Sequence, residues 1–315
     1  MTRQTRAALL SVLSNTFLLI LKTTVGVLTG SVGVLSAAAD SLNDLGASII
    51  AFFSVRASGQ PADVEHPFGH GKIENVSAAA EALLIFTAAI YIIYEAITRI
   101  ITPEPLSSPG AGMIVMVVTA LVDLGVSRYL LKVADETDSA AIRADAYHLT
   151  TDVWTAASVF VALGLVKITG IRLFDPIVAL IVAAAIIRVA VVLTLEAMGV
   201  LIDMRLPEQE LRQLEEIVMK TRKVVGFHKL RTRRSGPYRQ IDFHLIVPES
   251  LTVLEAHGLA ESIEDKIRRQ FPNTTVVTHI EPDTAAETSE PDTSLRNRSR
   301  RKRVINGTKR TRHRQ

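Results

Sequence analysis

Long apolar stretches restrict the possible folds of this chain more than any other feature of its sequence. Six of them can each supply the roughly 20 apolar residues that an α-helix needs to cross the hydrocarbon core of a bilayer. They fall at about residues 7–29, 31–55, 74–99, 108–133, 138–166 and 174–201. Hydrophobic residues make up 48% of the 315-residue chain, and the mean hydropathy is +0.27. The sequence predicts an α-helical membrane domain of six transmembrane helices over residues 1–205.

The distribution of basic residues predicts how these helices are oriented. An even number of spans places both termini on one side, and that side carries more of the basic residues near the helix ends, among them Arg3, Arg6, Arg56 and Lys72. Because cytoplasmic loops carry an excess of Lys and Arg, we expect cytoplasmic termini in an integral membrane protein.

Two pairs of polar residues interrupt the apolar stretches at four-residue spacing: Asp40 with Asp44, and His148 with Asp152. Residues at i and i+4 share one face of a helix, so each pair presents two ligands in the same direction. On the predicted topology the two pairs lie near the same depth. Three carboxylates and one imidazole can close a tetrahedral shell around a divalent cation, a geometry that suits Zn²⁺. The chain has no cysteine, which excludes thiolate ligands.

The alternative is a buried polar network that only joins two helices, and the small residues of SAAADS would allow such close packing. Three carboxylates and a histidine carry too little positive charge to neutralise one another, which favours the metal site. Without a cation the group must take up protons. Competition between metal and protons for the same carboxylates is the physical basis of antiport.

A second candidate site lies between the second and third apolar stretches, in PADVEHPFGHGKIEN. Asp63, His66 and His70 fall within eight residues, on a segment that Pro and Gly hold as a loop. They can bind a divalent ion partly exposed to solvent, and the alternative is an ordinary surface loop. Lys72 and Glu74 can have a structural role at the start of the third helix.

The composition changes after Asp203, where shorter periodic segments predict a small α+β domain over residues 206–283. A helix, two β-like runs, a helix near 252–270 and a last strand give the order α-β-β-α-β. Four histidines fall in this domain, with one nearby acid: His228, His244, His257, His279 and Glu281. Scattered, solvated histidines are the alternative to a third metal site.

Residues 284–315 are rich in Ser, Thr, Asn and Arg and show no apolar periodicity. We expect a disordered basic tail beside an anionic leaflet, and no nucleic-acid partner.

The motifs SAAADSLND, HPFGHGKIEN, AYHLTTD, FDPIVAL and LRTRRSGPYRQIDFHL together make the chain, up to about Asp283, similar to the cation diffusion facilitator family, and to its bacterial zinc-efflux members. The resemblance implies a homodimer of six-span subunits that exchange protons for cytosolic divalent metal by alternating access, with Zn²⁺ as substrate and regulatory ion and protons as counter-substrate. It implies that Asp40, Asp44, His148 and Asp152 form the transport site.

The resemblance also implies roles for residues outside that site. Asp63, His66 and His70 match a loop site. The residues His228, His244, His257, His279 and Glu281 match a binuclear site between two cytoplasmic, metallochaperone-like domains that sense metal and dimerise. Lys72 and Asp203 match a charge interlock near the dimer seam.

Two departures from the family pattern concern the metal sites. Glu281 stands where an Asp is expected, and Asn43 adds an amide oxygen beside Asp44 that favours harder ions. A His-x-x-x-Asp pair in the fifth span goes with zinc or cadmium in this family, so Zn²⁺ is the expected substrate.

Several other functions stay open. They are export of Fe²⁺, Mn²⁺ or Co²⁺, a membrane metal receptor without flux, and a membrane metalloenzyme. An enzyme needs an open metal position and a general base, whereas all four residues resemble ligands, so we expect a secondary active transporter.

Overall fold

The computed structural model describes residues 1–102, 111–171 and 173–283. The chain forms two compact units. Among the described residues, the helical unit contains those of Met1–Ile202 together with Ser235–Pro237, and the α+β unit contains Asp203–Arg234 and residues 238–283. The predicted basic tail, 284–315, lies outside the described residues.

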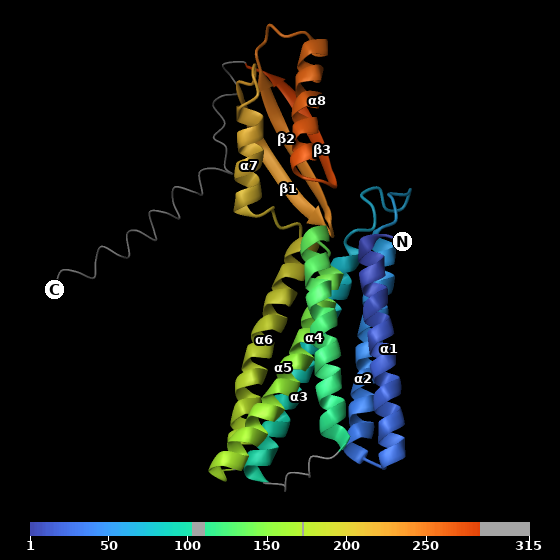
Figure 1. Ribbon diagram of the computed structural model, residues 1–315. Coiled ribbons are helices and arrows are strands. Elements are labelled where there is room, and N and C mark those ends of the chain that lie inside the picture. Colours follow the sequence, from blue (N-terminus) through green and yellow to red (C-terminus); the bar gives the residue numbers. More distant parts are fainter. Residues whose placement is uncertain (103–110, 172, 284–315) are drawn as a thin grey trace, which may run out of the picture. The chain divides into compact units, whose positions relative to one another are not determined.

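Six long helices make up the helical unit, and each falls on one of the apolar stretches of the sequence (Figure 1). They are α1 (Arg3–Thr29), α2 (Val32–Ser58), α3 (Ile73–Ile101), α4 (Ala111–Thr137), α5 (Ala140–Thr169) and α6 (Phe174–Leu201).

Local signals explain where these helices begin and end. The hydroxyls of Thr2, Ser31 and Ser139 accept the first free backbone N–H groups of α1, α2 and α5. Gly30 and Gly170 end α1 and α5 with φ of 64° and 71°, a left-handed conformation that glycine adopts without a Cβ clash.

Five of the described helices are long and apolar enough to cross a membrane: α1, α3, α4, α5 and α6. The exception is α2, which carries Asp40, Asp44 and Arg56. The helical membrane domain is therefore confirmed, while the sixth span stays a prediction. The helix that carries the first pair of candidate ligands is thus the one described long helix that these criteria do not select.

Small residues dominate the contacts inside the helical unit. The helices pack mainly as α1 on α2, α3 on α6 and α4 on α5. Where α3, α5 and α6 meet, the buried residues are Ala78, Ala144 and Ala197. The small side chain of alanine lets helix backbones approach closely. In a bilayer, where lipid tails are as apolar as the side chains, helices associate through such close packing rather than through the hydrophobic effect.

The α+β unit has the predicted order of elements: α7 (Glu208–Met219), β1 (Gly226–Ser235), β2 (Tyr238–Val247), α8 (Val253–Gln270) and β3 (Thr274–Pro282). The strands form one sheet in the order β1-β2-β3, with β2 and β3 parallel. A turn at Gly236, with φ of 57°, joins β1 to β2.

The two faces of this sheet differ in chemistry. Helices α7 and α8 cover one face (Figure 1), where Ile241, Phe243 and Leu245 of β2 are at most 2% exposed. Because side chains alternate along a strand, His244 points to the other face. In the parallel register His244 lies opposite His279, so the strands gather imidazoles on the side away from the helices.

Candidate metal centres

Three groups of potential metal ligands occur in the described part of the chain. Within each group, the ligand atoms all lie within 4.8 Å of one another. The groups are Asp44, His148 and Asp152 (the helical group), Asp63, His66 and His70 (the loop group), and His228, His244 and Glu281 (the sheet group).

The helical group joins α2 to α5 inside the helical unit. The Nε2 atom of His148 is 3.2 Å from Oδ1 of Asp44. The His148 side chain is only 11% exposed, against 22% for Asp44. Two of the three ligands are carboxylates, which the single imidazole cannot neutralise. Their spacing suits one divalent cation in the place now occupied by the His148–Asp44 contact.

Asp40 is not a member of this group. It lies one helical turn before Asp44 on α2, and it is exposed. Asn43 is exposed as well. Three of the four expected transport residues therefore converge, while the roles of Asp40 and Asn43 stay predictions.

Two further charged residues near the helical group were missed by the sequence analysis. Lys22 of α1 is 9% exposed and donates from Nζ to the hydroxyl of Ser41, 2.6 Å away. Asp123 of α4 is 4% exposed and interacts electrostatically with Asp152, Asp44 and Lys22. An ionisable residue within an apolar stretch already indicates a functional site, so both could have been predicted. They were missed because neither forms an i,i+4 pair with another candidate ligand.

Glu74 is buried and accepts hydrogen bonds from neighbouring helices, which indicates a structural role. It is 1% exposed at the start of α3, and its two oxygens accept hydrogen bonds from Ser58 of α2 (2.7 Å) and Ser139 of α5 (2.5 Å). Lys72 donates to the carbonyl of Leu201, 3.3 Å away. Glu74 therefore joins three helices at one end of the helical unit. This agrees with the structural role that the sequence analysis allowed for it.

The loop group is more exposed than the helical group. Oδ1 of Asp63 is 3.2 Å from Nδ1 of His66, and Oδ2 is 3.5 Å from Nε2 of His70. The side chain of Asp63 is 52% exposed and that of His70 only 10%. The backbone N–H of His66, which donates to Asp63, and the two histidines hold the pKa of Asp63 below its usual range. The carboxylate is thus ionised and ready to bind a cation at neutral pH.

The sheet group is organised by one carboxylate between two imidazoles. His244 donates from Nδ1 to Oε1 of Glu281 (2.6 Å), and His228 donates from Nε2 to Oε2 (2.5 Å). The side chain of Glu281 is 11% exposed. Burial favours its neutral form, but the hydrogen bonds from His244 and His228 outweigh this effect and lower its pKa. A metal ion binding here takes the place of the shared protons.

The other two histidines expected in this site are placed differently. The ring of His279 lies 4.6 Å from that of His244, and its Nε2 is 3.7 Å from Glu281, but 65% of the side chain is exposed. His257 is exposed on α8, which covers the opposite face of the sheet. Within one chain, His257 is therefore not part of the sheet group, and its role as a ligand stays a prediction.

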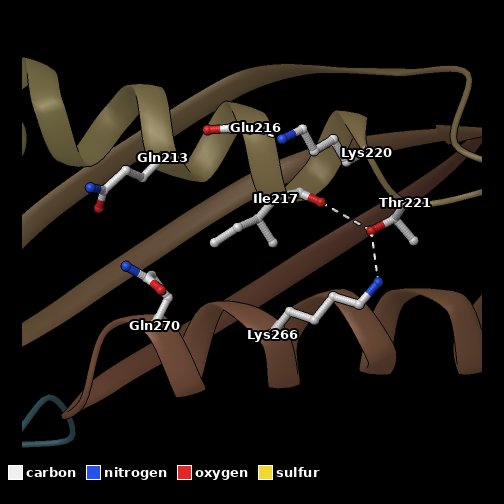
Figure 2. Close-up of a pocket in the computed structure, with 7 residues that line it drawn as sticks. All are labelled: Gln213, Glu216, Ile217, Lys220, Thr221, Lys266 and Gln270. Atoms are coloured by element: carbon white, nitrogen blue, oxygen red, sulfur yellow. Dashed lines mark hydrogen bonds and ion pairs between the residues drawn. The ribbon is translucent and has the colours of Figure 1, made fainter.

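The α+β unit also has a pocket of about 480 Å³ between α7 and α8 (Figure 2). It is lined by Gln213, Glu216, Ile217, Lys220, Thr221, Lys266 and Gln270. Glu216, its one acid, pairs with Lys220, and Lys266 donates to Thr221 at 3.0 Å. The pocket offers no histidine and no free carboxylate, so it does not have the chemistry of a transition-metal site.

Two family models match the chain over nearly all of its described length. The cation efflux transmembrane domain matches residues 8–202, and the cytoplasmic domain of cation efflux proteins matches residues 206–283. The chain belongs to the cation diffusion facilitator family. The resemblance found in the sequence is confirmed, and the chain is an integral membrane protein of a cation-efflux transporter family rather than an enzyme.

Named relatives in this family are of similar length. The chain is 37% identical over 277 residues to the cation-efflux pump FieF of Citrobacter koseri, and the match covers 88% of this chain and 92% of the relative. The identity and coverage are the same for FieF of Escherichia coli (strain K12 / DH10B). A solved structure of CzrB is 31% identical and covers 25% of this chain and 99% of that one, with a TM-score of 0.25. A TM-score of that size does not by itself establish a shared fold.

Proposed function

We propose that this member of the cation diffusion facilitator family is a divalent metal/proton antiporter that exports Zn²⁺ from the cytosol by alternating access. One observation carries the proposal. Asp44, His148 and Asp152 bring their ligand atoms within 4.8 Å of one another inside a unit built of membrane-length helices. Ionisable groups in such surroundings are costly and are found where an ion or proton passes.

The donor set supports zinc as the cargo. One imidazole and two carboxylates suit a borderline cation better than a hard one, and Zn²⁺ accepts both donor types in tetrahedral sites. We propose Asp40 as the fourth ligand, since it stands one turn from Asp44 on the same helix. Its exposure in this structure requires the side chain to turn toward the ion when metal binds.

The charge of the helical group supports exchange with protons. A metal-free state leaves two carboxylates with one imidazole for compensation, so protons must bind when the metal leaves. A cation and protons that compete for the same atoms cannot be bound together, and alternating access turns that competition into antiport.

Further parts of the proposal concern topology and assembly. We propose that α2 crosses the membrane with the other five helices, since the transmembrane family model spans all six. Both termini and the α+β unit then face the cytoplasm of a bacterium, in its inner membrane. The cytoplasmic-domain match supports that side.

The α+β unit is proposed as a metal sensor that dimerises. Its sheet group is almost complete in one chain, and His257 would come from the partner of a homodimer. Metal that binds between two copies stabilises the dimer by mass action. If His244→Ala left the metal dependence of both dimerisation and transport unchanged, the sensor role would be lost.

Flux through the purified full chain in proteoliposomes tests the transport proposal. Zn²⁺ is offered beside Mn²⁺, Fe²⁺ and Co²⁺, and Asp135→Asn serves as control because Asp135 is 71% exposed at the end of α4. Uptake of Zn²⁺ above the other ions supports the proposal. Uptake led by another metal keeps the mechanism and changes the cargo, whereas metal binding without uptake identifies a receptor.

A further inference from the structure

Two carboxylates of the helical unit, Glu81 of α3 and Asp145 of α5, are each 1% exposed. Neither oxygen of either side chain has a partner with ordinary hydrogen-bond geometry among the described residues. Each has one serine hydroxyl beside it, Ser77 at Glu81 and Ser11 of α1 at Asp145, in a contact outside that geometry. The two carboxylates interact electrostatically with each other.

The surroundings of this pair are apolar and closely packed. Ala78 and Ala82 flank Glu81 along α3, and Ala144 precedes Asp145 on α5, all at most 4% exposed. Ala78 and Ala144 belong to the same buried cluster, so α3 and α5 approach closely here. An ionised carboxylate in such a place, without a well-formed hydrogen bond, costs far more than a neutral carboxyl group.

Glu74, on the same helix, is the informative contrast. It is equally buried, but two serine hydroxyls donate to its oxygens at 2.7 and 2.5 Å. Two such donors stabilise a buried carboxyl group, whereas Glu81, two turns further along α3, has only the Ser77 hydroxyl beside it, outside ordinary hydrogen-bond geometry. Glu74 is therefore held by neighbouring helices, and Glu81 is not.

Protons fit the Glu81–Asp145 pair better than a metal ion does. Neither residue belongs to any group of three converging ligands in the described part of the chain, and one further ligand at least would be needed for a metal. Among the described residues, no Lys or Arg forms a hydrogen bond with either carboxylate. Two protons neutralise both carboxyl groups and require no additional side chain.

The position of the pair connects it to the helical group. Asp145 precedes His148 by three residues, so the two share a face of α5. Glu81 and Asp145 interact electrostatically with His148, and Asp145 also with Asp44 of α2. Two other helices contribute side chains near the pair. The hydroxyl of Ser11 of α1 lies beside Asp145, and Ala197 of α6 packs with Ala78 and Ala144. Neither acid is a member of the helical group itself.

We propose that Glu81 and Asp145 form a proton-binding pair, separate from the metal ligands, that holds protons exchanged for the transported metal. This inference rests on the proposed metal/proton exchange. A divalent ion at the helical group brings positive charge close to the pair and favours loss of protons from the two carboxyl groups to water. By reciprocity, protonation of the pair favours release of the metal.

Two transport assays on the full chain in proteoliposomes separate proton coupling from metal translocation. The first measures Zn²⁺ uptake driven by an imposed pH gradient. The second measures exchange of radioactive external Zn²⁺ for unlabelled internal Zn²⁺ without a gradient, which needs no net proton movement. The variants are Glu81→Gln and Asp145→Asn, which keep the size of each side chain. Glu95→Gln is the control, because Glu95 lies on the same helix in an exposed ion pair with Arg99.

We expect each variant to lose at least about tenfold of gradient-driven uptake while zinc exchange stays within about twofold of the wild type, and the control to match the wild type in both assays. Gradient-driven uptake within twofold of wild type in both variants would overturn the proton-binding pair, and so would parallel loss of uptake and exchange. If one variant does not fold, the other carries the test. A wild type that moves zinc without regard to the gradient contradicts the antiport proposal instead.

Discussion

At the scale of single residues, the helical group is defined by which carboxylates meet His148. Asp44 and Asp152 each bring a ligand atom within 4.8 Å of it, while Asp40, one helical turn from Asp44, is exposed and lies outside the group. The difference arises because i,i+4 spacing puts two side chains on one face of a helix without fixing how far each extends across it. The two aspartates of α2 are therefore expected to differ in function.

Replacement of Asp44 by Asn should abolish zinc flux. Asp40→Asn should lower it by only about 10- to 100-fold, the size of effect seen when a metal site is weakened but its other ligands stay in place. Asp44 supplies an oxygen that already lies 3.2 Å from His148, and Asp40 must move to bind. Initial rates of zinc uptake into proteoliposomes measure both effects. Equal rates for Asp40→Asn and wild type would remove Asp40 from the site.

Glu281→Gln should weaken metal binding at the sheet group at least about tenfold, because the amide cannot provide two anionic oxygens between His228 and His244. Chelator competition on full chain that carries Asp44→Asn and Asp63→Asn isolates this group. Glu281→Asp tests the added methylene. Affinity that stays the same in Glu281→Gln would show that the carboxylate is not a ligand.

At the scale of helices and strands, buried ion pairs and hydrogen bonds determine how elements are joined. In the α+β unit, Glu210 of α7 accepts from Arg234 of β1 (2.5 Å) and Arg239 of β2 (2.8 Å). In the helical unit, Glu74 joins α2, α3 and α5. Each carboxylate is the common acceptor for donors from two other elements, so its loss leaves several groups without a partner.

Glu74→Ala should destabilise the helical unit by about 1–3 kcal/mol, because two buried serine hydroxyls lose their acceptor. The thermal midpoint in detergent, compared with Glu95→Ala as an exposed control, measures the effect. An unchanged midpoint would contradict the structural role of Glu74.

Glu210 should make the stability of the α+β unit depend on pH. Partial burial favours its neutral form, but the hydrogen bond from Arg239 and the charge of Arg234 hold its pKa below the usual range. A carboxylate with a lowered folded pKa stabilises the protein above its unfolded pKa, about 4.3, and this stabilisation is lost as pH falls through the folded value.

Hydrogen exchange of peptides from 206–283 in the full chain measures this dependence. Wild type should be better protected than Glu210→Gln at pH 7, and the difference should shrink below about pH 4. A difference that persists unchanged at pH 3 would assign the effect to packing rather than charge.

The elements themselves were largely predictable from sequence. The six long apolar runs located the helices of the helical unit, and alternation in IDFHLIV located β2 and the face of His244. Contacts between elements were not predictable. The approach of Glu81 to Asp145 depends on how α3 packs on α5, and the separation of His257 from the sheet group depends on which face α8 covers.

At the scale of the whole molecule, the chain combines a helical unit that contains the helical group and an α+β unit that contains the sheet group. Membership of the cation diffusion facilitator family accounts for both units, since separate family models match each of them. On the proposed function, the first group moves metal and the second reports its concentration. The coupling of metal to protons is the claim on which the rest of this account depends.

Simultaneous recording of zinc and pH inside proteoliposomes tests that claim most directly. With an imposed pH gradient and the full chain in the membrane, we expect zinc to accumulate while the gradient collapses faster than it does without zinc, and Asp44→Asn to abolish both changes. Zinc accumulation that leaves the internal pH unaffected would contradict the account, because the metal would then cross without an exchanged proton.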